Sequence, residues 1–159
     1  MKQTIFKNGL LAGVVTMAFL SAVYAIDKTW LFSMTVISAT LVLYMLPMYR
    51  AANDVKMLEF KAVLRTAFVV FLIANAIYYV FDWVLFNIVD KSLANVQAEL
   101  AIEYYRPSTP IDKQSELADG IRAANIHDVK SLIYRFVRGA IGGFGMAVLA
   151  AFLVKRQQA

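Results

Sequence analysis

Residues 67–89 read AFVVFLIANAIYYVFDWVLFNIV, an apolar stretch with one charged side chain, Asp82. A helix rises about 1.5 Å per residue, so about 20 apolar residues cross a hydrocarbon layer roughly 30 Å thick. The stretch therefore predicts a membrane-spanning helix. A charge inside such a helix is costly, so it usually has a partner or a function.

Three more stretches share this apolar character. They cover residues 8–26, 30–48 and 132–154. The first two contain no charged residue, whereas the last carries Arg135 and Arg138 near its start. Four such stretches predict an all-α, polytopic membrane protein, a four-helix bundle that forms one domain over residues 1–159. Between helices three and four we expect a helical extracytoplasmic segment, residues 90–131.

The composition differs from that of soluble domains. Of the 159 residues, 60% are hydrophobic and 17% are charged. In a typical soluble domain about half of the residues are hydrophobic and about a quarter are charged. The net charge is +5. We assign these cations to the cytoplasmic face of a membrane protein rather than to nucleic-acid binding. The chain has no cysteine, which excludes disulfides, thiolate catalysis and cysteine-ligated metals.

The charges of the connecting segments predict the orientation. Both ends of the chain and the second connection carry eight cations and two acids, whereas the first connection and residues 90–131 carry six cations and eight acids. Lys and Arg collect on the cytoplasmic side, and short connections count most. We therefore expect both termini in the cytoplasm and residues 90–131 outside.

The N-terminal segment also has the features of a secretory signal peptide. It has a basic start, an apolar middle and a passable cleavage site at Val23-Tyr24-Ala25. Its apolar run is long for a signal core, and a second apolar stretch follows almost at once. We therefore expect a retained helix over residues 8–26.

The segment between helices three and four shows helix signals of its own. Asp90 can cap a helix over residues 91–105, and Pro107 and Pro110 interrupt the chain after it. Asp112 can cap a second helix, for which Gly120 is a typical end. Asn125 can start the helix that becomes the last span, with Asp128 in its first turn. We expect a folded cap or a surface for a partner.

The charged residues inside the spans form the candidate site. Asp82 lies about 10 Å below the outer end of its helix and Arg138 about 9 Å below the outer end of the next, so their depths match. Arg135 lies one turn shallower and can share the carboxylate. The pair is either a structural salt bridge or a proton or substrate site. Asn75, near mid-membrane, is expected to bond another helix.

Small residues recur every four positions in the first and last spans. Gly9 and Gly13 lie in one row, and Gly139, Gly143 and Ala147 in the other. Such rows let two helices approach closely. We expect the last span to pack on the first within one chain, with homodimerisation as the alternative.

The sequence shows no catalytic or metal-binding motif. His127 is the only histidine, and we expect it to be solvated. No HExxH spacing and no phosphate loop occurs, because GAIGGFG lacks the Lys-Ser/Thr ending. We therefore expect no cofactor, no metal and no enzymatic activity.

Several stretches together resemble a known family. They are NGLLAG, FKAVLRTAFVVFLIANAIYYVFDWVLFNIVDKSL and the glycine-rich last span after a long outer segment. The pattern resembles a family of small bacterial membrane proteins that is defined only as a domain of unknown function. The resemblance implies a four-helix fold in the bacterial inner membrane, and it carries over no catalytic residue.

Two functions fit these observations. The first is a non-enzymatic structural or accessory protein of the lipid bilayer that binds a membrane or periplasmic partner through residues 91–131. The second is a small transporter or channel subunit that uses Asp82 with Arg138. A lipid-modifying enzyme is a third possibility, for which no motif speaks.

Overall fold

The computed structural model describes residues 2–124 and 126–157. Every regular element in these ranges is helical, which confirms the all-α prediction. The long helices are α1 (Lys2–Ile26), α2 (Met34–Asp54), α3 (Phe60–Val84) and α6 (Val129–Arg156). The shorter elements are the 3₁₀ turn η1 (Lys28–Phe32), the π-turn η2 (Leu85–Val89), α4 (Leu93–Tyr105), the 3₁₀ turns η3 (Arg106–Ser108) and η4 (Ile111–Lys113), and α5 (Gln114–Ala123).

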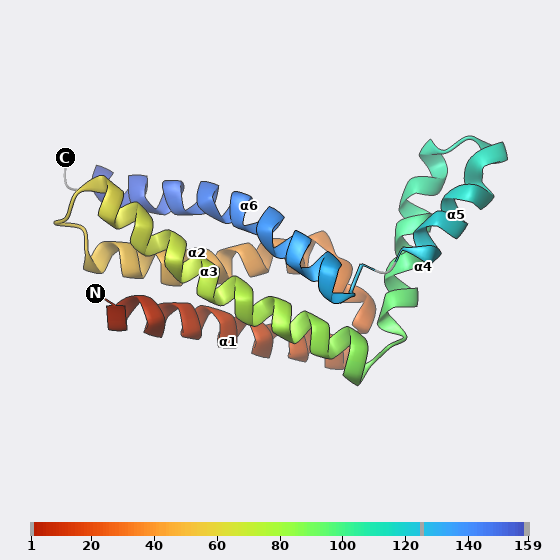
Figure 1. The fold of residues 1–159 in the computed structure, drawn as a ribbon, viewed down its shortest axis with the longest axis horizontal. Helices are drawn as coiled ribbons and strands as arrows, with labels where there is room; N and C mark the ends of the chain where they lie inside the picture. The colour runs from red at the N-terminus through yellow and green to blue at the C-terminus, as the bar shows by residue number, and fades with distance from the viewer. Residues whose placement is uncertain (1, 125, 158–159) are drawn as a thin grey trace.

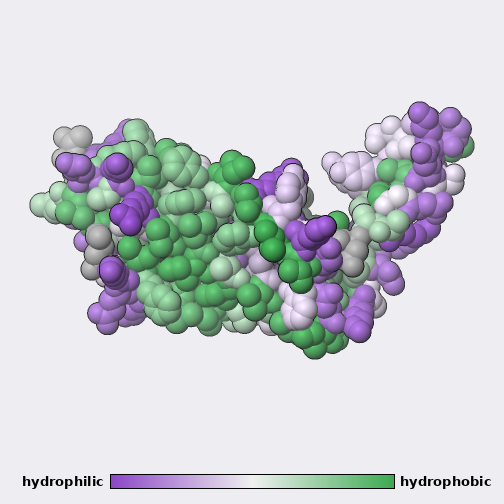
Figure 2. All heavy atoms as spheres, in the orientation of Figure 1, coloured by the Kyte–Doolittle hydropathy of each residue, from purple (hydrophilic) through white to green (hydrophobic). Residues whose placement is uncertain are grey.

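Four helices are long and apolar enough to cross a membrane: α1, α2, α3 with its η2 extension, and α6. They lie side by side and form what we call the helix core (Figure 1). Its visible face is mostly apolar, and polar side chains gather at its two ends (Figure 2). The four long helices run in alternating directions, so α1 begins and α6 ends at the same end, opposite α4 and α5 (Figure 1).

The third long helix is the centre of the core. α3 packs against α1, α2 and α6, whereas α1 and α6 meet it from different sides and barely touch each other. The fully buried side chains Val63 and Val70 of α3 lie in the main apolar cluster with Met48 of α2 and Val154 of α6. The residues that hold the core together therefore converge on α3.

Glycines bring α1 close to α3. A Cβ added at Gly9 would lie 2.7 Å from Cβ of Ile73, and one added at Gly13 would lie 2.6 Å from Cδ1 of Ile77. Real side chains do not approach so closely, so these two positions of α1 need glycine. The glycine row of the first span is thus used within the chain.

The glycine row of the last span also packs on α3, and the expectation that it packs on the first span is wrong. A Cβ at Gly143 would overlap the ring of Phe71, and one at Gly139 would lie 3.3 Å from Nδ2 of Asn75. Ala147 of the same row is fully buried. The physical reason is that α3 lies between α1 and α6, so each small-residue row meets the large side chains of α3.

A short turn and two side-chain caps mark the ends of the long helices. A turn over residues 55–59 separates α2 from α3, and α2 continues past Pro47 to Asp54. The Ser33 hydroxyl accepts a hydrogen bond from the Val36 amide at 3.3 Å, and Asp128 caps α6 by accepting one from Ser131 at 2.8 Å. Asp128 is therefore the cap itself rather than a residue of the first turn. Asn125 lies outside the described residues.

Residues 93–123 form a helical hairpin that projects from one end of the core, and we call it the arm (Figure 1). Ile102 of α4 is buried where α5 folds back. Gly120 lies inside α5 rather than at its end, because Leu117 and Ile121 continue the half-buried face on both sides of it. Asp90 does not cap α4. Its carboxylate accepts the Ser92 amide, and α4 begins after Ser92.

Candidate functional site

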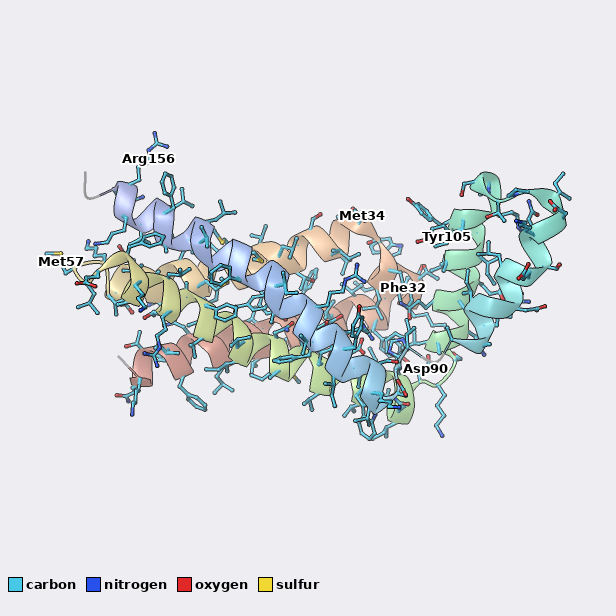
Figure 3. All side chains as sticks on the ribbon, turned by 45° about the horizontal axis from the view of Figure 1, so that its top comes forward. Phe32, Met34, Met57, Asp90, Tyr105 and Arg156 are labelled. Atoms are coloured by element: carbon cyan, nitrogen blue, oxygen red, sulfur yellow. The ribbon has the colours of Figure 1, made fainter. Side chains whose placement is uncertain are left out.

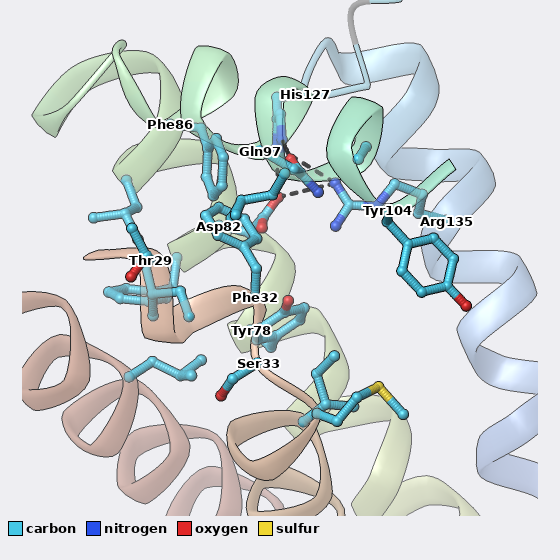
Figure 4. A pocket seen from close by; sticks show the side chains of 18 of the residues that line it. Thr29, Phe32, Ser33, Tyr78, Asp82, Phe86, Gln97, Tyr104, His127 and Arg135 are labelled. Atoms are coloured by element: carbon cyan, nitrogen blue, oxygen red, sulfur yellow. Dashed lines mark hydrogen bonds and ion pairs between the residues drawn. The ribbon is translucent and has the colours of Figure 1, made fainter. Parts of the chain in front are cut away.

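Asp82 lies on α3 at the arm end of the core and is buried, with 5% of its surface exposed. Its Oδ2 atom lies 3.2 Å from Nη1 of Arg135 on α6 and 3.2 Å from Nδ1 of His127 in the segment before α6 (Figure 4). One carboxylate oxygen thus joins α3 to α6 and to the end of the segment between them.

Arg135, rather than Arg138, is the partner of Asp82. Arg138 is exposed, and among residues 2–124 and 126–157 no carboxylate lies within ion-pair distance of it. The reason is helical direction rather than depth. Arg135 lies four residues before Gly139 and so shares the row that faces α3, whereas Arg138 is turned away by about 60°.

His127 is part of the same cluster, and the expectation of a solvated histidine is wrong. Only 4% of its surface is exposed. Its Nε2 lies 2.8 Å from Oε1 of Gln97 on α4, and its ring stacks on Phe86 with centroids 3.6 Å apart. The Asn87 amide donates to the His127 carbonyl at 3.1 Å. His127 therefore connects the arm to the core.

The π-turn η2 follows α3 and positions two residues that contact His127. It begins three residues after Asp82, and the Asp90 amide closes it on the Leu85 carbonyl. A π-turn inserts an extra residue into a helix and is frequent at functional sites. Here it carries Phe86 and Asn87, the two residues that hold the ring and the carbonyl of His127. Hydropathy does not reveal such a turn, because its residues are as apolar as the helix before it.

Arg135 is fixed by three further contacts. Its Nη1 also donates to the Ile126 carbonyl at 3.3 Å, and its guanidinium carbon lies 5.5 Å from the centre of the Tyr79 ring. The Tyr79 hydroxyl donates to the backbone carbonyl of Arg135 at 3.0 Å. These contacts orient the guanidinium toward Asp82, so the two charges largely compensate each other where water is scarce.

A second anchor holds the base of the arm. Asp90 accepts hydrogen bonds from Ser92 and from the Tyr24 hydroxyl of α1, and Lys28 lies 3.6 Å from its carboxylate. The hydrogen bonds from Ser92, with the Lys28 ammonium and Tyr24, hold the pKa of Asp90 below its ordinary value. Leu93 is fully buried beside this anchor. The arm is therefore attached at two separate points.

Asn75 does not have the interhelical bond expected of it. It is buried on α3 against Gly139, and its Nδ2 has no hydrogen-bond partner among the residues described. A buried amide without a partner is costly, because it has lost water and gained nothing in return. Asn75 lies about one helical turn farther from the arm than Tyr79, and it is not part of the cluster formed by Asp82, Arg135 and His127.

The Asp82 cluster forms one wall of a cavity of about 730 Å³ between the core and α4 (Figure 4). Most of the lining is apolar or aromatic. It includes Leu20, Phe32, Tyr78, Phe81, Leu100 and Tyr104. Cavities of a few hundred to a thousand Å³ with a few convergent polar groups are the usual form of small-molecule sites. The arrangement can hold a molecule with an apolar body and a polar end.

Comparison with known proteins identifies one family. A family model described as a protein of unknown function (DUF4199) matches residues 7–156. The chain belongs to this family. The match confirms the resemblance to a family defined only by its unknown function. It covers α1 from Lys7 onward, the other three long helices and the arm of this family member. No curated protein and no solved structure matches the chain.

Proposed function

We propose that this family member is a non-enzymatic accessory protein of a bacterial inner membrane, and that its arm binds the extramembranous part of another membrane or periplasmic protein. In this proposal both termini lie in the cytoplasm and the arm lies outside. The excess of cations at the end of the core opposite the arm supports this orientation.

The observation that carries the proposal is the exposed apolar surface at the tip of the arm. Tyr104, Tyr105 and Ile111 expose 78%, 50% and 89% of their surfaces. Exposed apolar groups that cluster on a projecting element indicate a contact surface. Tyrosine is also enriched among the residues that dominate binding energy, because its ring is large and loses little conformational freedom.

The base of the arm is built differently from its tip. Leu93 is fully buried, and Asp90 and His127 tie the start and end of the segment to the core. A rigid base holds the tip at a fixed distance from the membrane surface, which reduces the entropy lost when a partner binds.

A second candidate function is a small transporter subunit, and the burial of Asp82 and Arg135 beside a cavity favours it. The packing farther from the arm opposes passage through the core. There Ala12, Ala67, Ala74, Ala147 and Met48 are fully buried in one apolar cluster. Proton- or ion-dependent flux in vesicles that is lost in Asp82→Asn would favour this candidate over the first.

Site-specific photocrosslinking in native membranes tests the proposal. A crosslinking amino acid at Tyr105 or Ile111 should give one discrete protein adduct. The matched control is Asp119, an exposed polar position on the same arm, which should give none. Adducts to lipid alone, or equal protein adducts from Asp119, would contradict a partner-binding tip.

A further inference from the structure

Residues of the helix core line one side of the cavity beside Asp82, and residues of α4 line the other. Leu20 of α1, Ile37 of α2 and Phe81 of α3 line it from the helix core, and Leu100 and Tyr104 line it from α4. The space-filling view shows the surface hollowed between the core and the arm (Figure 2). The side chains around it converge from both parts (Figures 3 and 4). The cavity thus opens where the apolar surface of the core gives way to the polar arm.

Several polar atoms at this wall have no hydrogen-bond partner among the described residues. Oδ1 of Asp82 accepts no hydrogen bond from any described residue, although the side chain is only 6% exposed. Of the guanidinium nitrogens of Arg135, only Nη1 donates to a described residue. The Tyr78 hydroxyl also lines the cavity without a partner in the described chain. None of these atoms is among the buried side-chain atoms that lack a partner in the described residues. They are therefore accessible from the cavity, where they can make hydrogen bonds to a ligand.

The charges at this wall select a particular kind of polar group. A simple anion would be attracted by Arg135 and repelled by Asp82, and a simple cation would meet the opposite forces. A dipolar group with a hydrogen-bonding cation next to an anion satisfies both residues at once. Its cation donates to Oδ1 of Asp82, and its anion accepts from the free side of the Arg135 guanidinium.

The position of the cavity selects a molecule with an acyl chain. It lies at the arm end of helices that are long and apolar enough to span a membrane. Trp30 is half exposed and Lys28 partly exposed at this same end, as expected near lipid headgroups. Leu20 and Ile37 extend the cavity toward the hydrocarbon region. An amphiphile can therefore place its head at Asp82 and its chain along these apolar residues.

We propose that the cavity between the helix core and α4 binds a zwitterionic aminophospholipid, with its ammonium at Asp82 and its phosphate at Arg135. Phosphatidylethanolamine has this chemistry. Its ammonium carries N–H donors, whereas the quaternary ammonium of phosphatidylcholine carries none, and phosphatidylglycerol has no cation. This proposal does not rest on the function proposed for the arm, although Tyr104 and Tyr105 belong both to the lining of the cavity and to the tip of the arm.

Native mass spectrometry of the full chain tests the site. The purified protein is equilibrated with equal amounts of phosphatidylethanolamine, phosphatidylcholine and phosphatidylglycerol of the same chain length. One phosphatidylethanolamine should be retained about tenfold better than either competitor, the effect of one charge-assisted hydrogen bond. Equal retention of the three lipids, or preference for phosphatidylcholine, would overturn the proposal.

Variants separate the site from general lipid contact. Asp82→Asn and Arg135→Gln should each abolish the preference, whereas Arg138→Gln, an exposed arginine on the same helix, should keep it. If the first two variants do not fold, Ala101→Phe is the second test, because it fills the cavity and leaves the charges in place. A folded Ala101→Phe protein that retains the lipid as well as the parent does would contradict the site.

A soluble headgroup distinguishes a lipid from a free phosphate ester. Phosphoethanolamine at millimolar concentration should leave the melting temperature unchanged, because it has no chain to occupy the apolar part of the cavity. A clear rise with phosphoethanolamine and no selective lipid retention would assign the cavity to a soluble metabolite and reject the lipid.

Discussion

Asp82 is a carboxylate removed from water, and its stability depends on the two groups at its Oδ2 atom. Removing Arg135 or Asp82 alone leaves the other charge uncompensated, at a cost of roughly 3–5 kcal/mol for fully buried pairs. Arg135 is 27% exposed, so we expect the lower end of that range. Asp82→Ala should therefore lower the melting temperature of the purified protein in detergent.

The double variant Asp82→Leu with Arg135→Met tests whether the pair is structural. It should recover most of the stability, because apolar side chains of similar size need no compensating charge. Asp82→Leu with Arg138→Met is the control, and it should not recover, since Arg138 is not the partner. Equal recovery in both double variants would show that the ion pair contributes nothing.

The sequence indicated Asp82, Arg135 and Arg138 as the charged residues of the site, but these residues were compared only by their depth along the helices. Depth alone favoured Arg138. The four-residue row of Gly139, Gly143 and Ala147, continued toward the start of the helix, reaches Arg135 and would have identified it. His127 could not be assigned in this way, because its burial depends on Phe86 in a π-turn and on Gln97 in another helix.

At the scale of whole helices, Gly143 is the glycine of α6 at which an added Cβ would meet a side chain of α3 most closely. Gly143→Leu should destabilise the protein by about 1–3 kcal/mol or more, because the new side chain would overlap Phe71 in a packed core. Gly142→Leu is the matched control, since a side chain there meets open space. Thermal unfolding in detergent measures both. Equal melting temperatures would mean that the two helices separate at this point.

The arm should respond to acid through Asp90. The pKa of this carboxyl is below its ordinary value of 3.8, because it accepts hydrogen bonds from Ser92 and faces Lys28. A lowered pKa stabilises the folded state above pH 3.8, and this stabilisation is lost as the pH falls through the folded-state value. Hydrogen-exchange protection of residues 93–105 should therefore drop in strong acid.

Asp90→Asn should reproduce part of that loss at neutral pH. Asp112→Asn, an exposed carboxylate on the same arm, is the control and should change little. Unchanged protection of α4 in Asp90→Asn would show that His127 and Leu93 suffice to hold the arm.

Hydropathy predicted the number and order of the long helices, because length and apolar content are properties of each segment alone. The ends were less accurate. Helical hydrogen bonding continues beyond the apolar part, so α1 begins at Lys2 and α3 at Phe60. Gly120 was misread as a helix end, because its cost inside α5, about 1 kcal/mol, is offset by packing of its neighbours on α4.

For the molecule as a whole, the charge distribution predicts cytoplasmic termini. Single cysteines at Gln3 and Gln157 should resist an impermeant thiol reagent on intact cells, and a cysteine at Ser108 should react. The chain has no cysteine of its own, so each label reports one site. Reaction at Gln3 or Gln157 but not at Ser108 would invert the orientation.

The central position of α3 also sets the order in which the protein assembles during synthesis. Chains are made from the N-terminus, so α1 and α2 enter the membrane before the residues that fill their packing faces exist. Gly9 and Gly13 gain their neighbours only when Ile73 and Ile77 arrive. A chain whose synthesis stops between residues 26 and 73 therefore leaves the glycine face of α1 without the α3 side chains that cover it.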